Sequence, residues 1–454
     1  MVVVGHWLVA DLAWSSGRVS QVSALAEVPA MWPLTWISVV IPLFFFVGGY
    51  ANRRSWEGCL RRGQGYAAFL DRRAHRMLVP TWAYLVVVGT AGVLVDRLGG
   101  LGIRTFGGLL LQPLWFLGAY LWVVALVPAT LRAHRRWGWR VPVAGLVLVA
   151  LSDAVRITAG VAALGYLNVL TVWLVMHQLG YHYRDGTIAH PGLMAGLGLA
   201  ATVGLVSLPA YPATMVGVPG GEAGNMHPPT MAVATLGIAQ VGLAVLARPY
   251  LLRWLHRPPV WRMVVLVNLN VVTVYLWHQL ALAVAARAAL PLGYPTPTPG
   301  SPGWWAVHLL WLALPAAVLV GIASVVGRAE RVAAPPPAPA GSTTARAAAA
   351  SAALIGLAML ALAGSSATEP FATGATLGPL VASPVLGLAA LGVGSAVLRA
   401  CRSGPGPARV ALALGACCLV ALGLAWSSAA VVVLGAIPAM ASAVPERRAR
   451  PARC

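Results

Sequence analysis

Apolar runs separated by short polar segments follow one another along most of the chain. Ten runs precede residue 330, at about 2–13, 36–51, 78–95, 112–131, 141–152, 162–180, 192–208, 230–247, 264–286 and 305–327. Four more follow near 347–363, 376–398, 410–426 and 429–444. Several approach the roughly 20 residues that a helix needs to cross the hydrocarbon core of a bilayer. The pattern predicts an all-α, polytopic transmembrane helix bundle, with about ten helices in a core domain and about four more in a C-terminal extension.

The chain divides into three parts by composition. Residues 1–330 hold the ten runs of the core domain, and residues 331–346 form a linker rich in proline and alanine. Residues 347–454 form a transmembrane extension rich in alanine, glycine and leucine, with few polar residues inside its apolar runs. Because polar groups inside a membrane domain are costly and usually functional, we expect the chemistry before about residue 330.

The overall composition agrees with a membrane protein, since 59% of the 454 residues are hydrophobic and only 9% are charged. The net charge of +20 would also suit a nucleic-acid partner. However, the basic residues are arginines in short clusters between apolar runs, where orientation signals are found. We therefore expect membrane lipid, and not nucleic acid, as a partner.

The arginines also predict an orientation in the membrane. If segment 52–77 is cytoplasmic, 26 arginines fall on that side and five on the other: Arg18, Arg97, Arg104, Arg156 and Arg287. This imbalance follows the positive-inside rule. It predicts a multi-pass protein of the plasma membrane, with the N-terminus and the arginine-rich loops in the cytoplasm.

The first apolar run, 2–13, is too short to cross a bilayer unaided. Two explanations are open: the true start of the protein lies upstream, or this helix begins within the membrane. The first explanation is preferred here.

Three histidines inside apolar runs are candidates for chemistry. His6 is a candidate general base, because an imidazole can take up and return a proton near neutral pH; a packing role between helices is an equal alternative. For His278, next to Gln279, a polar contact that orients helices is preferred over catalysis. His177 lies at the cytoplasmic end of its run, where an interfacial position is preferred, but it is a better candidate for lining a site than His308.

A cluster of arginines precedes the third apolar run. Arg73 and Arg76 are three residues apart and would share one face of a helix, with Arg72 beside them. Two guanidinium groups on one face suit a phosphate-bearing ligand, whereas the alternative is anchoring to anionic lipid. The five cysteines show no metal-ligand spacing, so no metal is expected.

Several of these segments together resemble acyltransferase family 3, a family of integral membrane enzymes. The stretches that carry the resemblance are VVVGHWLVA, IPLFFFVGGYANRRSW, FLDRRAHRMLVPTW, PLWFLGAYLWVVALVP, VWLVMHQLGYHYRDG, HPPTMAVATLGIAQ and VYLWHQLALA, in that order within residues 1–330. The resemblance implies the ten-helix domain of that family. It also implies transfer of an acyl group, acetyl above all, from acyl-CoA to a hydroxyl of a carbohydrate, an envelope polymer or a secondary metabolite.

Individual residues match the family's motifs. The first-helix histidine falls on His6, implicated in acyl transfer, and the arginine-x-x-arginine motif falls on Arg73 and Arg76, which would bind acyl-CoA with Arg72 beside them. The family's arginine about ten residues before that histidine has no counterpart, because only five residues precede His6. Further residues that would line the site are Trp115, Tyr120, His177, Gln178 and His278.

A second class of function is a transporter or flippase for a phosphate-bearing or lipid-linked substrate. Arginines at one membrane face and polar residues inside the bundle would also suit the transport of such a substrate. Two observations disfavour it: the sequence shows no two-fold repeat of the kind found in many transporters, and few carboxylates lie inside the apolar runs.

Overall fold

The computed structural model describes residues 2–15, 18–97, 110, 113–217, 224–332, 375–377 and 380–382. The predicted linker, 331–346, lies outside the described residues apart from its first two. The predicted extension, 347–454, also lies outside them, apart from two short antiparallel strands, β3 (Ala375–Leu377) and β4 (Leu380–Ala382). An apolar helix was expected to begin at this point. The sequence Gly–Pro between the two strands disfavours a helix there, because proline lacks the amide hydrogen that a helix needs.

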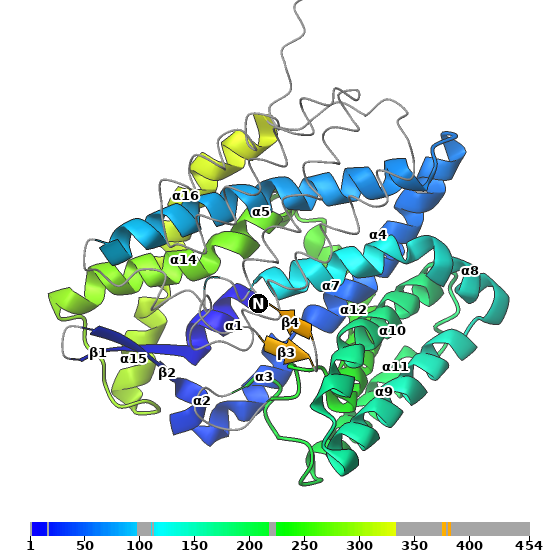
Figure 1. Cartoon of the computed structure of the whole chain (residues 1–454), viewed down its shortest axis with the longest axis horizontal. Coiled ribbons are helices and arrows are strands. Elements are labelled where there is room, and N and C mark those ends of the chain that lie inside the picture. The colour runs from blue at the N-terminus through cyan, green and yellow to red at the C-terminus, as the bar shows by residue number, and fades with distance from the viewer. Residues whose placement is uncertain are drawn as a thin grey trace, which may run out of the picture. The chain divides into compact units, whose positions relative to one another are not determined.

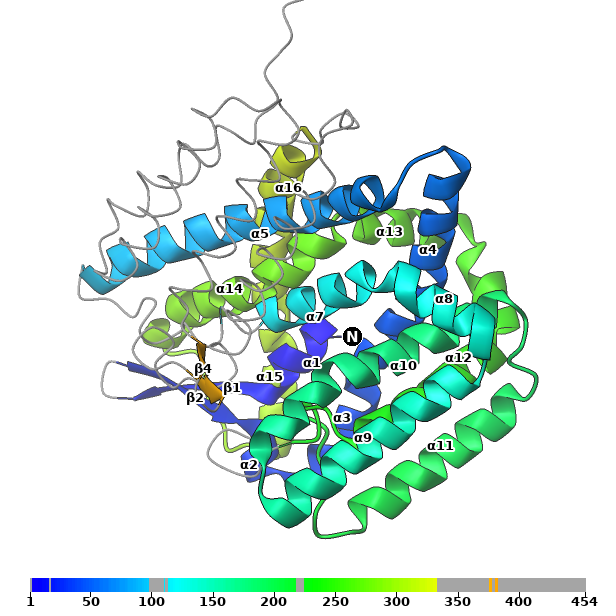
Figure 2. The same cartoon turned by 45° about the vertical axis from the view of Figure 1, so that its right-hand side comes forward.

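The chain forms two compact units, which are described separately. The first comprises residues 1–65, 119–271 and 278–320, and the second comprises 66–118, 272–277 and 321–454. Helices dominate the described residues of both units, as the apolar runs predict, and Figures 1 and 2 label them.

The elements have the following bounds. The first unit contains α1 (Val2–Val9), β1 (Ala10–Ser15), β2 (Arg18–Ser23), α2 (Ala24–Glu27), η1 (Pro29–Met31), α3 (Trp32–Ser38), α4 (Ile41–Arg61), α8 (Val127–Trp137), α9 (Arg140–Ala159), η2 (Ala162–Tyr166), α10 (Leu167–Arg184), α11 (Pro191–Val206), α12 (Met231–Leu255), α13 (Pro258–Leu269), η3 (Leu290–Leu292) and α15 (Pro302–Trp311). The second contains α5 (Tyr66–Arg97). Residues of both units occur in α7 (Leu114–Ala125), α14 (Val271–Ala289) and α16 (Ala313–Val332).

Several helices can cross a membrane by length and composition. Within the described residues, five segments qualify: Pro29–Arg61, Arg140–Ala159, Met231–Leu255, Val271–Leu292 and Pro302–Gly327. A sixth consists of α7 and α8, which meet at a bend of 57°. The chain is therefore a polytopic helical membrane protein, as predicted. Among the other four core runs, those of α1, α10 and α11 are shorter or more polar, whereas α5 has 32 residues and contains the uncharged run 78–95.

Several predicted runs are divided in the structure. The run 2–13 contains only the eight-residue helix α1, and β1 pairs with β2 in an antiparallel hairpin directly after it. The run 264–286 is broken at Asn270, whose side-chain amide donates to the carbonyl of Leu266, 2.9 Å away. Such side-chain bonds compete with the helical backbone pattern and explain why a helix ends at an asparagine. The run 305–327 is broken at Leu312, between α15 and α16.

Helix α10 lies at the centre of the first unit, where it packs between α4 and α9, and α12 packs against α11 and α4 (Figure 2). Glycines allow α4 and α10 to touch backbone to backbone. A Cβ atom on Gly49 would overlap the carbonyl of His177, and one on Gly180 would overlap the carbonyl of Phe46. Close approach through small residues is a common way for membrane helices to associate. The same contact fixes the position of α10, which carries several polar side chains.

We expect Gly49→Ala to lower the free energy of unfolding by about 3 kcal/mol, because the new methyl group must push α4 away from α10. Gly196→Ala on α11 is the control, since a Cβ atom there meets open space. Thermal unfolding in detergent, followed by circular dichroism, measures both effects. Equal melting temperatures for the two variants would contradict the backbone contact.

A buried carboxylate organises one end of the same helices. Asp153 of α9 is 1% exposed and accepts hydrogen bonds from the Asn168 amide (3.0 Å), the Tyr211 hydroxyl (3.0 Å) and the Met231 backbone N–H (2.7 Å). The bond to Met231 satisfies an amide at the start of α12, as a capping side chain does. Asp153 therefore joins the C-terminal end of α9 to the N-terminal ends of α10 and α12.

Candidate active site

His6 lies on α1 and contacts two polar side chains of α14. Its Nδ1 atom is 2.8 Å from Nε2 of His278 and 3.3 Å from the amide nitrogen of Gln279. The two imidazole rings stack, with centroids 5.1 Å apart and planes inclined by 20°. His278 and Gln279 are buried, at 0% and 1% exposed, whereas His6 is half-buried. The structure thus joins residues 272 positions apart in the sequence.

Two further hydrogen bonds hold α1 in place. The indole N–H of Trp7 donates to the backbone carbonyl of His278 (3.1 Å), and Nε2 of His308 on α15 is 3.2 Å from the carbonyl of Leu8. A helix of eight residues is unstable alone in water. The contacts of Trp7 with α14 and of Leu8 with α15, directly after His6, therefore fix the position of α1.

The proton between His6 and His278 can lie on either nitrogen. If Nδ1 of His6 carries it, His278 accepts the bond and Nε2 of His6 retains a lone pair that can take up a proton. This tautomer is the one that general-base catalysis requires. It also requires the amide of Gln279 to present its oxygen to His6, since nitrogen and oxygen of an amide are exchanged by a half-turn.

A third histidine lies near this pair. His227, in the segment before α12, interacts electrostatically with His6. Its side chain is exposed, yet the protein around it lowers its pKa to about 4 through desolvation. Sequence reasoning did not single out His227, although a histidine directly before two prolines was a usable signal.

His177 and Tyr120 meet elsewhere in the first unit, between α4, α7 and α10. Nε2 of His177 is 3.2 Å from the amide nitrogen of Asn52, and the Tyr120 hydroxyl donates to the carbonyl oxygen of the same amide (3.4 Å). Asn52 and His177 are 0% exposed. Gln178, also predicted to line a site, donates to the carbonyl of Thr130 (3.0 Å). The predicted lining residues therefore separate into a His6–His278 pair and a buried His177–Asn52–Tyr120 cluster.

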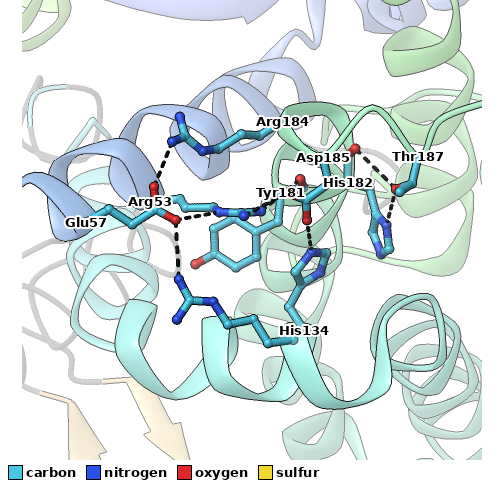
Figure 3. Close-up of polar contacts among 9 residues, drawn as sticks. Arg53, Glu57, His134, Tyr181, His182, Arg184, Asp185 and Thr187 are labelled. Carbon is cyan, nitrogen blue, oxygen red and sulfur yellow. Dashed lines mark hydrogen bonds and ion pairs between the residues drawn. The ribbon is translucent and has the colours of Figure 1, made fainter.

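An ionic network joins the C-terminal ends of α4 and α10 to α8 (Figure 3). At its centre, the Arg53 side chain is 11% exposed and bonds to Glu57 (3.0 Å) and Asp185 (2.7 Å). It also donates to the backbone carbonyl of Tyr181 (3.3 Å). Arg53 therefore connects α4 to the C-terminal end of α10.

Each carboxylate in the network has further partners. Arg184 bonds to Glu57 (2.7 Å), as does the more exposed Arg135 (3.4 Å), while His134 is 2.9 Å from Asp185. The hydrogen bond with Arg53, followed by that with His134, lowers the pKa of Asp185 to about 2. Arginines from three segments predicted to face the cytoplasm therefore share one network at one end of the first unit. Sequence reasoning missed Glu57, although its place four residues after Arg53 is typical of a helical ion pair.

The predicted donor-binding arginines belong to the second unit. Arg72, Arg73 and Arg76 all lie on α5, which begins at Tyr66, earlier than the apolar run suggested. Arg72 and Arg73 are half-buried and Arg76 is exposed. Trp115, another predicted lining residue, is half-buried next to Phe116 in the same unit, with ring centroids 6.1 Å apart.

Comparison with known proteins gives one match. A family model described as an acyltransferase domain, of the acyltransferase 3 type, matches residues 1–327, nearly the whole predicted core domain. No curated protein and no solved structure matches the chain.

Proposed function

Because the chain belongs to acyltransferase family 3, we propose that this membrane acyltransferase moves an acetyl group from acetyl-CoA to a hydroxyl of a carbohydrate, an envelope polymer or a secondary metabolite. The observation that carries the proposal is the contact of His6 with His278 and Gln279. A histidine oriented by a second polar group, inside a helix bundle, has the geometry of a general base.

In the proposed reaction, Nε2 of His6 takes the proton from the acceptor hydroxyl. The hydroxyl oxygen then bonds to the thioester carbonyl carbon, and the carbon–sulfur bond breaks. The proton passes from His6 to the departing sulfur, so that an ester and free CoA are the products. Nε2 of His278 accepts a hydrogen bond from the Nδ1–H of His6 and thereby stabilises the imidazolium that forms between the two steps.

The donor is proposed to bind through Arg73 and Arg76, with Arg72 beside them. Coenzyme A carries phosphate groups, and a guanidinium can bind two phosphate oxygens at once. Spacing of three residues on α5 supports this role, because it places both side chains on one face of the helix. The orientation proposed from the arginines has this region, like the N-terminus, on the cytoplasmic side of the plasma membrane, where acetyl-CoA is made.

We expect Arg73→Ala and Arg76→Ala each to raise the KM for acetyl-CoA by about 10-fold, because each removes a charge-assisted hydrogen bond. The value of kcat should change little, since these groups are distant from the reacting carbonyl in the extended CoA molecule. Arg61→Ala, an exposed arginine at the end of α4, is the matched control. Initial rates over a range of acetyl-CoA concentrations measure the effect; an unchanged KM in both variants would exclude these residues as the donor site.

Acyl transfer is distinguished from transport by a labelling experiment. Isolated membranes that contain the protein are incubated with radiolabelled acetyl-CoA, without an ion gradient or a membrane potential. The proposed function predicts label in an alkali-labile ester, and none in membranes that contain His6→Ala. Label that crosses the membrane only as intact acetyl-CoA, without forming an ester, would favour a transporter and contradict the proposal.

A further inference from the structure

The turn before α12 holds an exposed histidine on an otherwise enclosed segment. Within residues 224–230, His227 is exposed and Pro228 is half-buried, while the other five residues are buried. The two ends of the turn are bonded to each other: the Thr230 hydroxyl donates to the side-chain oxygen of Asn225 (2.8 Å), and the Thr230 N–H donates to its backbone carbonyl (2.9 Å). The turn is therefore closed by its own polar groups, and it leaves the His227 side chain at its surface.

Neighbouring segments hold the turn at both ends. At its start, the side-chain amide of Asn225 donates to the carbonyls of Pro212 (2.6 Å) and Thr214 (3.0 Å). Directly after it, the Met231 N–H donates to the buried carboxylate of Asp153 (2.7 Å). A side chain on such a turn is fixed in position before any ligand binds, which is what a catalytic hydrogen-bond donor requires.

Helix α3 connects this turn to α1. Helix α1 packs against α3, and a Cβ atom on Gly5, the residue before His6, would lie 3.1 Å from the Cβ of Ser38. One turn earlier on α3, the Thr35 hydroxyl accepts a hydrogen bond from the backbone N–H of Met215 (3.0 Å). Met215 directly follows the residue whose carbonyl accepts from the turn. The turn and α1 are therefore both attached to α3.

Two further observations place His227 near His6. Val9 of α1 and Val216, in the segment that leads to the turn, pack against the same cluster of buried hydrophobic residues. In addition, His6 and His227 interact electrostatically. Such interactions weaken with distance and are largely screened beyond about 10 Å. Packing and electrostatics thus agree that the turn carries His227 beside the proposed base.

The reaction proposed above needs a hydrogen-bond donor that His6 and His278 do not supply. When the acceptor oxygen attacks, negative charge develops on the thioester carbonyl oxygen, and donors aimed at that oxygen are often the largest contribution to catalysis. His6 is engaged with the hydroxyl proton, and His278 is bonded to His6. A neutral imidazole has one N–H to donate. Because the pKa of His227 is lowered to about 4, it is neutral at pH 7 and adds no second positive charge when His6 takes up its proton.

From this placement we propose that His227 is a second catalytic residue, whose ring N–H donates a hydrogen bond to the thioester carbonyl oxygen of the acyl donor. As the oxygen–carbon bond forms, the electron pair of the carbonyl moves onto its oxygen, where this hydrogen bond stabilises the charge. The pair then returns, the carbon–sulfur bond breaks, and the sulfur takes the proton from His6. His227 itself neither gains nor loses a proton. The inference rests on the proposed function and assigns the carbonyl oxygen a partner in it.

Kinetics of position 227 variants provide the first test. With purified full-length protein in liposomes, His227→Ala should lower kcat for ester formation by about 10²-fold, with little change in the KM for acetyl-CoA. His227→Gln, which restores a neutral N–H donor, should recover about 10-fold of that loss, whereas His227→Phe, which keeps a ring without an N–H, should not. His190→Ala is the matched control, because His190 is also exposed and lies directly before a proline, at the start of α11. It should retain the parent activity.

Infrared spectroscopy of a bound analogue tests the hydrogen bond itself. The probe is a ketone analogue of acetyl-CoA in which a methylene group replaces the sulfur and the carbonyl carbon is ¹³C, so that no acyl group can be transferred. Its carbonyl stretch should lie at lower frequency on the parent and on His190→Ala than on His227→Ala, because a hydrogen bond weakens the carbonyl bond. A side chain that only supports the fold would not change this frequency.

Equal kcat values for the parent and His227→Ala, equal losses in His227→Gln and His227→Phe, or an unchanged carbonyl frequency would each overturn the role of His227. Failure of the proposed function is recognised separately, since the parent protein would then form no ester. The infrared comparison would still show in that case whether His227 contacts the carbonyl of a bound donor.

Discussion

Replacing His6 with alanine is expected to lower kcat for acyl transfer by about 10³-fold, with little change in the KM for acetyl-CoA. The reason is that His6 is the proposed general base, and without it the acceptor hydroxyl has no assigned group to take its proton. The measurement is the initial rate of ester formation by purified protein, with membrane extract of the host as acceptor. His256→Ala, which removes an exposed histidine at the end of α12, is the control and should retain full activity.

Variants of His278, which contacts His6, give a further prediction about the role of His6. If His278 acts only by holding the His6 ring, then His278→Ala should reduce kcat less than His6→Ala does. The double variant should then be no worse than His6→Ala alone, because groups that act as a unit do not contribute additively. Additive losses, or normal turnover by His6→Ala, would contradict the assigned roles.

The second large effect concerns stability. Arg53→Met is expected to lower the free energy of unfolding by about 3 kcal/mol, because it leaves Glu57 and Asp185 without their shared cation. Partial exposure of Asp185, at 34%, keeps the effect below that of a fully buried pair. The neighbouring Arg54→Met is the control, since Arg54 is exposed on the same helix. Thermal unfolding in detergent compares the two; equal loss would show that the network does not stabilise the bundle.

The pH dependence of this network has a definite sign. Asp185 has its pKa lowered to about 2, so its charged form is favoured in the folded state. Its contribution to stability is fully present above the ordinary aspartate pKa of about 4, and it is lost as the pH falls towards about 2. The difference in stability between the parent and Asp185→Asn should therefore be constant near neutral pH and disappear between about pH 4 and pH 2. A difference that persists at the lower pH would exclude ionic pairing as its cause.

Local sequence features predicted the membrane helices well, and their breaks less well. The run 141–152 corresponds to α9 because hydrophobicity alone determines a segment that crosses lipid. The run 264–286 was predicted as one helix, whereas Asn270 divides it. A single polar residue changes the average hydrophobicity of a run very little. Asn270 ends the helix through one side-chain hydrogen bond to the backbone, and the pattern of apolar residues does not reveal such a bond.

The candidate site was predicted in part for a similar reason. His6 and His278 could each be identified as polar residues in apolar runs, but their 2.8 Å contact depends on how α1 and α14 pack. Likewise, sorting arginines onto alternate loops placed Arg53 and Arg184 on one side. It could not show that Glu57 lies between them, because that arrangement requires α4 and α10 to meet at their glycines.

Transfer of the acyl group at His6 can be tested by a single-turnover measurement. Purified protein in liposomes is mixed, in excess, with radiolabelled acetyl-CoA and the acceptor extract, so that the rate reports the chemical step alone. The account predicts rapid label in an alkali-labile ester for the parent protein and a rate about 10³-fold slower for His6→Ala. Equal single-turnover rates for the two proteins would contradict it.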